Sequence, residues 1–137
     1  MHRRTLLQSL PLLALAGKVS LGEAASPNAV YELRQYSVFP GKLDGLLARF
    51  RDHTLALFNR HGIRSVAYWT VIDPAPDAPA LVYILAHESR DAADKNWAAF
   101  RADPDWIKAK ADSEANGQLV SRVQSTFMKL ADFSPSV

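Results

Sequence analysis

The sequence has 137 residues, with 16 Lys and Arg against 14 Asp and Glu, a formal net charge of +2 and no cysteine. Its 48% hydrophobic and 22% charged residues are typical of one globular domain with a core, and exclude disordered or repeat-built proteins. Without cysteine, the chain forms no disulfide, thiolate zinc site or iron–sulfur cluster.

Residues 1–25 have the three-part order of an export signal. Arg3 and Arg4 precede an apolar run over 6–16, which is shorter than the roughly 20 apolar residues of a membrane-spanning helix. Paired arginines followed by two leucines resemble a twin-arginine signal, with ordinary secretion as the alternative. We therefore expect a signal peptide over 1–25, a domain over 26–137, no stable membrane anchor, and a periplasmic or secreted bacterial protein.

The expected signal peptide over 1–25, here called the leader, accounts for the basic excess of the whole chain. It holds Arg3, Arg4 and Lys18 against Glu23, so that residues 26–137 carry 13 basic and 13 acidic side chains. A neutral domain with interspersed charges has no electrostatic footprint for phosphate backbones. We expect no binding to nucleic acid.

The first half of the domain predicts a strand, a helix and a hairpin. Alternating β-branched and aromatic residues over 30–39 predict the strand. Apolar residues at three- and four-residue intervals over 42–60 predict an amphipathic helix, which Gly62 ends as a left-handed cap. The β-rich runs over 63–72 and 81–87 predict a hairpin with a proline-rich loop.

The second half predicts a helix and a last strand. Ser89 is expected to cap a helix that extends to Phe100, Asp103-Pro104 to begin a short helical turn, and 119–130 to form the strand. The order β-α-β-β-α-β predicts an α+β, ferredoxin-like fold, in which two helices cover one face of a four-stranded antiparallel sheet.

The other face of that sheet needs a cover. Several hairpin residues that we place there are too apolar for open water, and a second copy packed sheet to sheet is the economical solution. We therefore expect a homodimer. The residues assigned to this face are Val66, Tyr68, Thr70, Val82 and Ile84.

Three histidines lie outside the leader. His53 and His87 are placed where they could approach a cleft between helix and sheet and act as a base or hydrogen-bond a ligand; a core-edge histidine is the alternative. His61 is most simply a helix-end cation beside Gly62. Neither an HxH nor an HExxH spacing occurs, so we expect no metal.

A polar cluster and an aromatic group complete the candidates. Glu32, Arg34 and Tyr36 share one strand face, and we place them between two sheets, either to bind a carboxylate or enolate or to seal a dimer. Aromatic residues around the second helix form either core or a hydrophobic pocket. The candidate ligand-binding residues are Arg34, Tyr36, His53, Tyr68, Trp69, His87 and Trp97. The nucleotide, phosphate and nucleophile motifs are absent, so we expect no cofactor and assign no catalytic residue.

The motifs YELRQY at 31–36, PGKL at 40–43 and WAAFRADPDW at 97–106 resemble the NIPSNAP family. The resemblance implies a dimeric α+β barrel, in a superfamily that includes cofactor-independent monooxygenases, isomerases, cyclases and haem-degrading enzymes. It supplies no settled reaction, and the asparagine, tryptophan and histidine set of the haem-degrading relatives has no clear counterpart.

Three functions therefore stay open. The first is binding of a small apolar or aromatic molecule in a helix–sheet pocket, with or without cofactor-free oxygenase, isomerase or cyclase activity. The second is a non-catalytic assembly or interaction domain. The third is a haem or metal binder.

Overall fold

The computed structural model describes residues 28–137, so the signal peptide expected over 1–25 lies outside the described residues. Four antiparallel strands form one sheet in the order β2-β3-β1-β4. Their bounds are β1 (Val30–Val38), β2 (Arg64–Thr70), β3 (Leu81–His87) and β4 (Val120–Met128).

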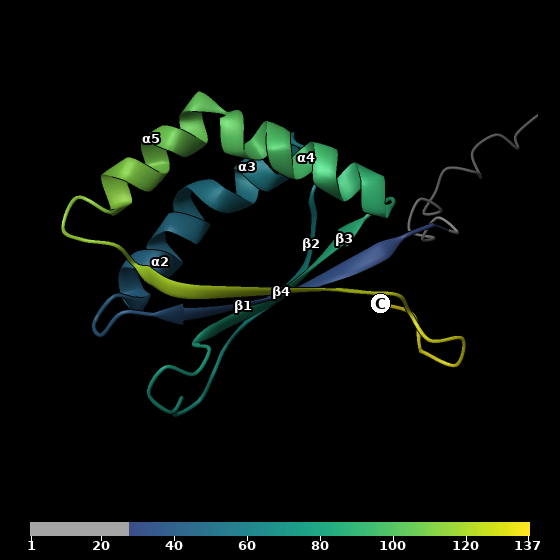
Figure 1. Ribbon diagram of the computed structural model, residues 1–137, viewed down its shortest axis with the longest axis horizontal. Coiled ribbons are helices and arrows are strands. Elements are labelled where there is room, and N and C mark those ends of the chain that lie inside the picture. The colour runs from purple at the N-terminus through teal and green to yellow at the C-terminus, as the bar shows by residue number, and fades with distance from the viewer. Residues whose placement is uncertain (1–27) are drawn as a thin grey trace, which may run out of the picture.

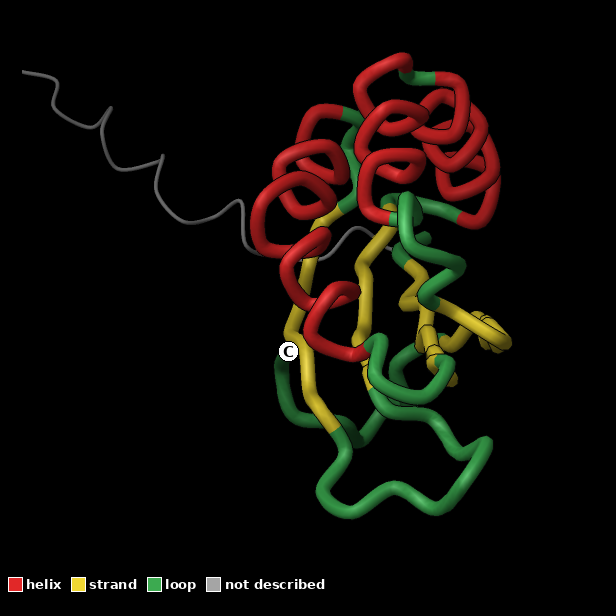
Figure 2. Tube along the Cα trace, turned by 90° about the vertical axis from the view of Figure 1, so that its left-hand side faces the viewer, coloured by secondary structure: helices red, strands yellow, loops and turns green. Residues whose placement is uncertain are grey.

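The helices all lie against one face of this sheet (Figures 1 and 2). Helix α2 (Leu43–Arg49), the π-helix η2 (Phe50–Thr54) and α3 (Leu55–Arg60) follow one another without a break, and α4 (Arg90–Ala102) and α5 (Pro104–Ser113) form the second helical segment. This arrangement confirms the predicted α+β, ferredoxin-like order. Within residues 28–137, none of the helices is long and apolar enough to cross a membrane.

The helix ends explain where each helical segment begins and stops. The Ser89 hydroxyl accepts a hydrogen bond from the backbone N–H of Ala92 at 3.0 Å, as predicted for an N-cap. Gly62 has a φ of +75°, which confirms the predicted left-handed cap after α3. Asp103 caps α5 by accepting from the Asp105 N–H at 2.8 Å. We predicted only a short turn there, and the structure forms a ten-residue helix instead.

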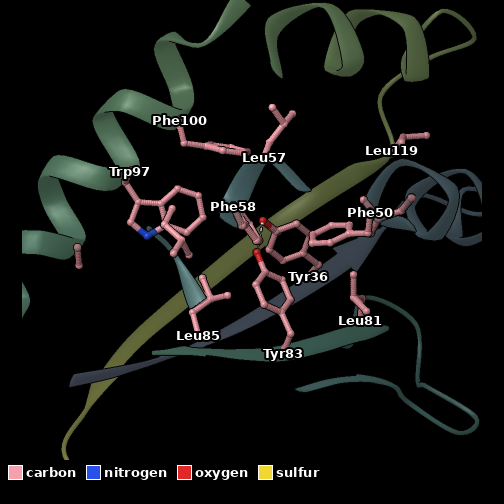
Figure 3. Close-up of a cluster of buried hydrophobic side chains, with 13 residues drawn as sticks. Tyr36, Phe50, Leu57, Phe58, Leu81, Tyr83, Leu85, Trp97, Phe100 and Leu119 are labelled. Atoms are coloured by element: carbon pink, nitrogen blue, oxygen red, sulfur yellow. Dashed lines mark hydrogen bonds between the residues drawn. The ribbon is translucent and has the colours of Figure 1, made fainter. Parts of the chain in front are cut away.

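The core lies between the sheet and the helical layer. Phe58, Tyr83 and Leu85 are 0–1% exposed, and Trp97 and Phe100 of α4 pack against Phe58 with ring centroids 5.4 and 5.0 Å apart. Figure 3 shows these side chains converging from β3 and the helices, together with Tyr36 of β1. Each buried aromatic or aliphatic side chain of this kind stabilises the fold by about 1.5–3 kcal/mol.

The face opposite the helices, which we call the open face, differs from the predicted one. Tyr68 pairs with Tyr83 and stacks on its ring at 4.9 Å, so it lies on the helix side, and Thr70 pairs with the core residue Leu81. The prediction placed both on the open face and was wrong because the strand register shifts between Ser65 and Ala67, which reverses the alternation.

Open-face positions of the inner strands include Leu33, Val82 and Ile84, which are half-buried, and Trp69 on β2 pairs with Val82 and is 50% exposed. Val82 and Ile84 were correctly assigned to this face. Its exposed and half-buried apolar side chains leave it suitable for packing against another surface.

Candidate functional site

A buried carboxylate on β1 joins four elements of the fold. Glu32 is 1% exposed. Its Oε1 accepts hydrogen bonds from His87 Nε2 and Trp97 Nε1, both at 2.8 Å, and its Oε2 accepts from Arg34 Nη1 at 3.0 Å and Ser125 Oγ at 2.6 Å. Four donors satisfy the two oxygens, so Glu32 is held as a carboxylate without contact to water.

Arg34 extends this network to two tyrosines. Its Nη2 donates to the Tyr36 hydroxyl at 3.0 Å and its Nε donates to the Tyr83 hydroxyl at 3.2 Å. The two hydroxyls point toward one another and lie 2.9 Å apart (Figure 3). The Arg34 guanidinium also lies 4.4 Å from the ring centroid of Trp97, within range of a cation–π contact. The planar fork of an arginine suits this arrangement, because one side chain binds three acceptors in fixed directions.

The surroundings of these groups shift their pKa values. Burial alone would raise the pKa of Glu32, but hydrogen bonds from His87, Ser125 and Trp97 together with the charge of Arg34 lower it to about 2. Because the ionised carboxylate can only accept, His87 Nε2 carries the hydrogen of their bond. Burial raises the pKa of Tyr68 to about 12 and that of Tyr83 well above its ordinary value, so both phenols stay protonated near neutral pH.

The Glu32 network lies on the helix side of the sheet. Arg34 and Tyr36 pair across β1–β3 with the core residues Tyr83 and Leu81, and Trp97 reaches Glu32 from α4. We predicted a position between two packed sheets, and that prediction was wrong. Alternation along β1 correctly grouped Glu32, Arg34 and Tyr36, but a period of two does not reveal which face the helices cover.

A cleft of about 380 Å³ opens beside this network, between the two helical segments and β4. Arg34, Tyr36 and Trp97 line it on the network side. Its other walls combine aromatic and polar side chains, and the helices leave much of edge strand β4 exposed along it. The remaining aromatic lining residues are Phe50, Phe58, Phe100 and Trp106. A volume of this size and a lining that combines aromatic surface with polar groups are found in small-molecule sites.

The π-helix shapes one wall of the cleft. Arg49, Phe50 and Thr54 all line the cleft, and the Thr54 hydroxyl donates to the carbonyl of Arg49, five residues earlier, at 3.3 Å. A π-helical turn is wider than an α-helical one and changes which side chains share a face; such turns are frequent at functional sites. Here it accompanies a buried arginine whose guanidinium lies 5.1 Å from the Trp106 ring centroid.

The structure brings together four of the seven candidate residues, namely Arg34, Tyr36, His87 and Trp97, in the Glu32 network. Tyr68 adjoins the network by stacking on Tyr83. His87 is buried behind the network and does not line the cleft, and its Nδ1 has no partner among the described residues.

The other two candidates lie elsewhere. His53 is exposed and lines a separate groove between η2 and α5, so it does not approach the cleft as expected. Trp69 is on the open face of the sheet. His61 lies at the end of α3 as predicted, and its Nε2 is 2.7 Å from the Asp103 carboxylate, a partner that we did not foresee.

Sequence reasoning missed several residues that complete the site. Tyr83 and Ser125 belong to β3 and β4, and only the strand register, which sets both beside Arg34, shows that they join β1. Arg49 fell on the polar side of the predicted helix, but in the structure it is buried at the end of α2, directly before the π-helical turn, and lines the cleft. Period-two alternation of β3 would have grouped Tyr83 with Leu81 and Leu85, but no pattern reports which strands are neighbours.

The sheet order, the helices on one face and the cleft between the two layers define an α+β protein of the dimeric α+β barrel fold. The NIPSNAP family model matches residues 31–135. The chain therefore belongs to the NIPSNAP family. No curated protein matches the sequence significantly.

Solved structures of similar fold come from several bacteria. Protein Atu4242 from Agrobacterium tumefaciens is 25% identical, with a TM-score of 0.67 over 79% of this chain and 99% of its own. An uncharacterized NIPSNAP-like domain protein from Burkholderia xenovorans is 18% identical, with a TM-score of 0.67 over 79% of this chain and 90% of its own. SnoaB from Streptomyces nogalater, a cofactor-independent oxygenase, is 18% identical, with a TM-score of 0.52 over 79% of this chain and 98% of its own.

Proposed function

We propose that this protein binds a small aromatic molecule in the cleft between the helices and β4. The observation that carries the proposal is the cleft itself, with about 380 Å³ of space, aromatic walls and the Arg34 and Tyr36 side chains on one side.

Native mass spectrometry of the protein purified from the cells that make it tests this proposal. We expect a co-purified small molecule that is released on unfolding. A Val123→Trp substitution on β4 should exclude the molecule, because Val123 lines the cleft and is 44% exposed, leaving room for a larger side chain to enter it. The matched control is Val71→Trp, at a position that is 38% exposed and lies outside the cleft.

Protein that carries no molecule, and that binds no member of a library of aromatic fragments, would overturn ligand binding and favour a non-catalytic assembly domain. Loss of the molecule in both tryptophan variants would show that the cleft is not where it binds.

A second candidate function is cofactor-independent oxygenation of the bound molecule. The fold resembles that of SnoaB, and on this chain Arg34 and Tyr36, which both line the cleft, suit stabilisation of an enolate or phenolate oxygen. Oxygen uptake in the presence of an enolisable aromatic ketone such as 2-tetralone tests it. Equal oxygen uptake with and without the protein would exclude oxygenation of this ketone and leave ligand binding as the only proposed function.

The haem or metal alternative finds no support in residues 28–137, where no group of three or more potential metal ligands occurs. His87 is enclosed and donates to Glu32, and His53 lies on a separate groove. Neither histidine is placed to ligate a metal in the cleft. Absorbance of the purified protein between 350 and 700 nm, where about 400 nm would mark a haem, tests this alternative.

We also propose that the protein is an exported homodimer joined through the open face of the sheet. The half-buried Leu33, Val82 and Ile84 and the exposed Trp69 support a sheet-to-sheet interface. The leader pattern over 1–25 supports export. Cell fractionation of the native chain and of an Arg3→Lys, Arg4→Lys double variant tests the twin-arginine route; export of both would indicate ordinary secretion.

A further inference from the structure

The cleft concentrates positive charge on a domain that has none overall. Residues 26–137 carry equal numbers of basic and acidic side chains, 13 of each. Four basic side chains line the cleft, and the one acidic lining residue is Glu114. This local excess is a property of the site and not of the chain. The four basic residues are Arg34, Arg49, Arg101 and Lys110. Arg122 also borders the cleft, but it pairs with Ser37 on β1, so its side chain lies on the open face of the sheet.

Most of this charge is incompletely neutralised. Arg34 has its own partner in Glu32, while Glu114 is shared between Arg49, at 3.6 Å, and Lys110, at 2.9 Å. Arg101 takes part in no ion pair within residues 28–137. The Arg101 guanidinium lies 5.2 Å from the Trp97 ring centroid, so a second cation borders the aromatic surface that Arg34 already contacts.

Arg49 carries an unmet hydrogen-bonding need inside the cleft wall. It is 5% exposed, its Nη1 donates to Ser113 Oγ at 3.2 Å, and its Nε has no partner among the described residues. Burial lowers the pKa of Arg49, but a guanidinium stays charged in proteins. A buried donor without an acceptor destabilises the protein that contains it, and an anionic ligand oxygen would supply the acceptor.

We propose that the ligand of this cleft is an aromatic acid, with its carboxylate directed at Arg49 and its ring against Trp106 and Phe100. Arg101, exposed at the cleft, adds attraction for the anion. This inference rests on the proposed ligand-binding function and specifies the chemical class of the ligand. The aromatic walls alone would accept neutral and charged rings alike, and the unneutralised arginines make the distinction.

Three probes of the same shape test the charge requirement: 2-naphthoate, the neutral 2-naphthylmethanol and the cationic 2-naphthylmethylamine. Binding to the purified protein is followed by calorimetry and by quenching of tryptophan fluorescence. We expect 2-naphthoate to bind at least about tenfold more tightly than the alcohol, since hydrogen bonds to charged groups are worth about 1.5–3 kcal/mol. Raising the salt concentration should weaken the naphthoate and leave the alcohol unchanged.

Substitutions identify the residue responsible. Arg49→Met retains a long apolar side chain against Trp106 and should reduce the affinity for naphthoate to that for the alcohol. Arg101→Gln, at an exposed position, should lower naphthoate affinity and its salt dependence without disturbing the fold. The matched control is Arg51→Met, on the exposed outer side of η2 and away from the cleft, which should change neither.

The outcomes separate the two proposals. Equal affinity for the naphthoate and the alcohol would leave aromatic binding intact and overturn the acid requirement, as would tightest binding of the amine. No binding of any probe would overturn the acid requirement, and the co-purification and fragment-library experiments would then decide ligand binding by itself. Arg49→Met is checked for folding by circular dichroism. If it does not fold, two other measurements decide the acid requirement: the comparison of the three probes on the native protein, and the naphthoate affinity of Arg101→Gln.

Discussion

Trp97 on α4 donates its indole N–H to Glu32 on β1 at 2.8 Å, and this bond fastens the helical layer to the middle of the sheet. The same carboxylate oxygen accepts from His87 on β3. The tryptophan ring therefore serves two purposes: its edge satisfies a buried anion while its surface faces the cleft. The hydrogen bond of Trp97 to Glu32 and the contact of its ring with the cleft can therefore be separated by mutation.

A Trp97→Phe substitution removes the hydrogen bond and keeps an aromatic ring. We expect the free energy of unfolding to fall by about 1.5–3 kcal/mol, the range for hydrogen bonds to charged groups. Urea unfolding of the two proteins measures it. Trp106→Phe is the control, because the Trp106 indole makes no hydrogen bond to another described residue; an equal loss in both variants would assign the effect to ring size alone.

Glu32→Gln tests the charge of the central carboxylate. The change leaves Arg34 buried without its ionic partner and turns an amide N–H₂ toward hydrogen-bond donors, so we expect a loss of about 3–5 kcal/mol. Thermal and urea unfolding report it, with the exposed Asp132→Asn as a control of equal charge change. A loss below about 1 kcal/mol, the usual value for surface pairs, would show that the network is not essential to stability.

The pKa of Glu32 predicts an acid-sensitive fold. Its folded value of about 2 lies below the ordinary 4.5, so the ionised form is stabilised in the folded state. This contribution is complete above pH 4.5 and is lost as the pH falls toward 2, for about 3 kcal/mol in total. Urea unfolding at a series of pH values measures the slope, and Glu32→Gln should lack that part of it. An unchanged slope in the variant would assign the acid sensitivity to other carboxylates.

Arg34→Ala should disturb ligand binding and stability more than Arg51→Ala. Arg34 holds Glu32, Tyr36 and Tyr83 together beside the cleft, whereas Arg51 is exposed. We expect a stability loss of about 3 kcal/mol for the first, since a buried charge loses its partner, and within about 0.5 kcal/mol for the second. Calorimetric unfolding and probe titration measure both. Equal, negligible effects would remove Arg34 from the site.

The proposed dimer depends on the open face of the sheet. Trp69→Lys should lower the molar mass measured by light scattering at micromolar concentration, because a charge would be placed in the interface. Ile107→Lys on α5 is the matched control, since Ile107 is 56% exposed and lies in the helical layer, and Trp69 is 50% exposed. A native protein that is monomeric at these concentrations, or two variants that behave alike, would contradict the interface.

Local patterns predicted most of the fold because each element has a local cause. The Ser89 cap, the Gly62 cap and the strand predicted over 30–39 depend on neighbouring residues, and the structure confirms both caps and a strand over Val30–Val38. The helix after Asp103 was underestimated because few of its residues are buried, which left no apolar stripe to extend the prediction.

The site was predicted in part, and the failures share a physical reason. Grouping Glu32, Arg34 and Tyr36 needed only the two-residue period of one strand. The side of the sheet on which they lie depends on how the helices cross, and the register shift in β2 moved Tyr68 to that side. His53 lies next to the apolar stripe of its helix, so a small rotation decides between cleft and outer surface, and no local signal fixes such a rotation.

Glu32 also has a consequence for how the domain folds. Its bonds join residues 55, 65 and 93 positions apart in the sequence, from β3, α4 and β4. Until all three elements have arrived, the carboxylate must either remain in water or be buried with donors missing, and both hold the core open. Partly assembled states are therefore penalised, and residues 28–137 should fold and unfold in one cooperative step, at a rate limited by long-range contacts.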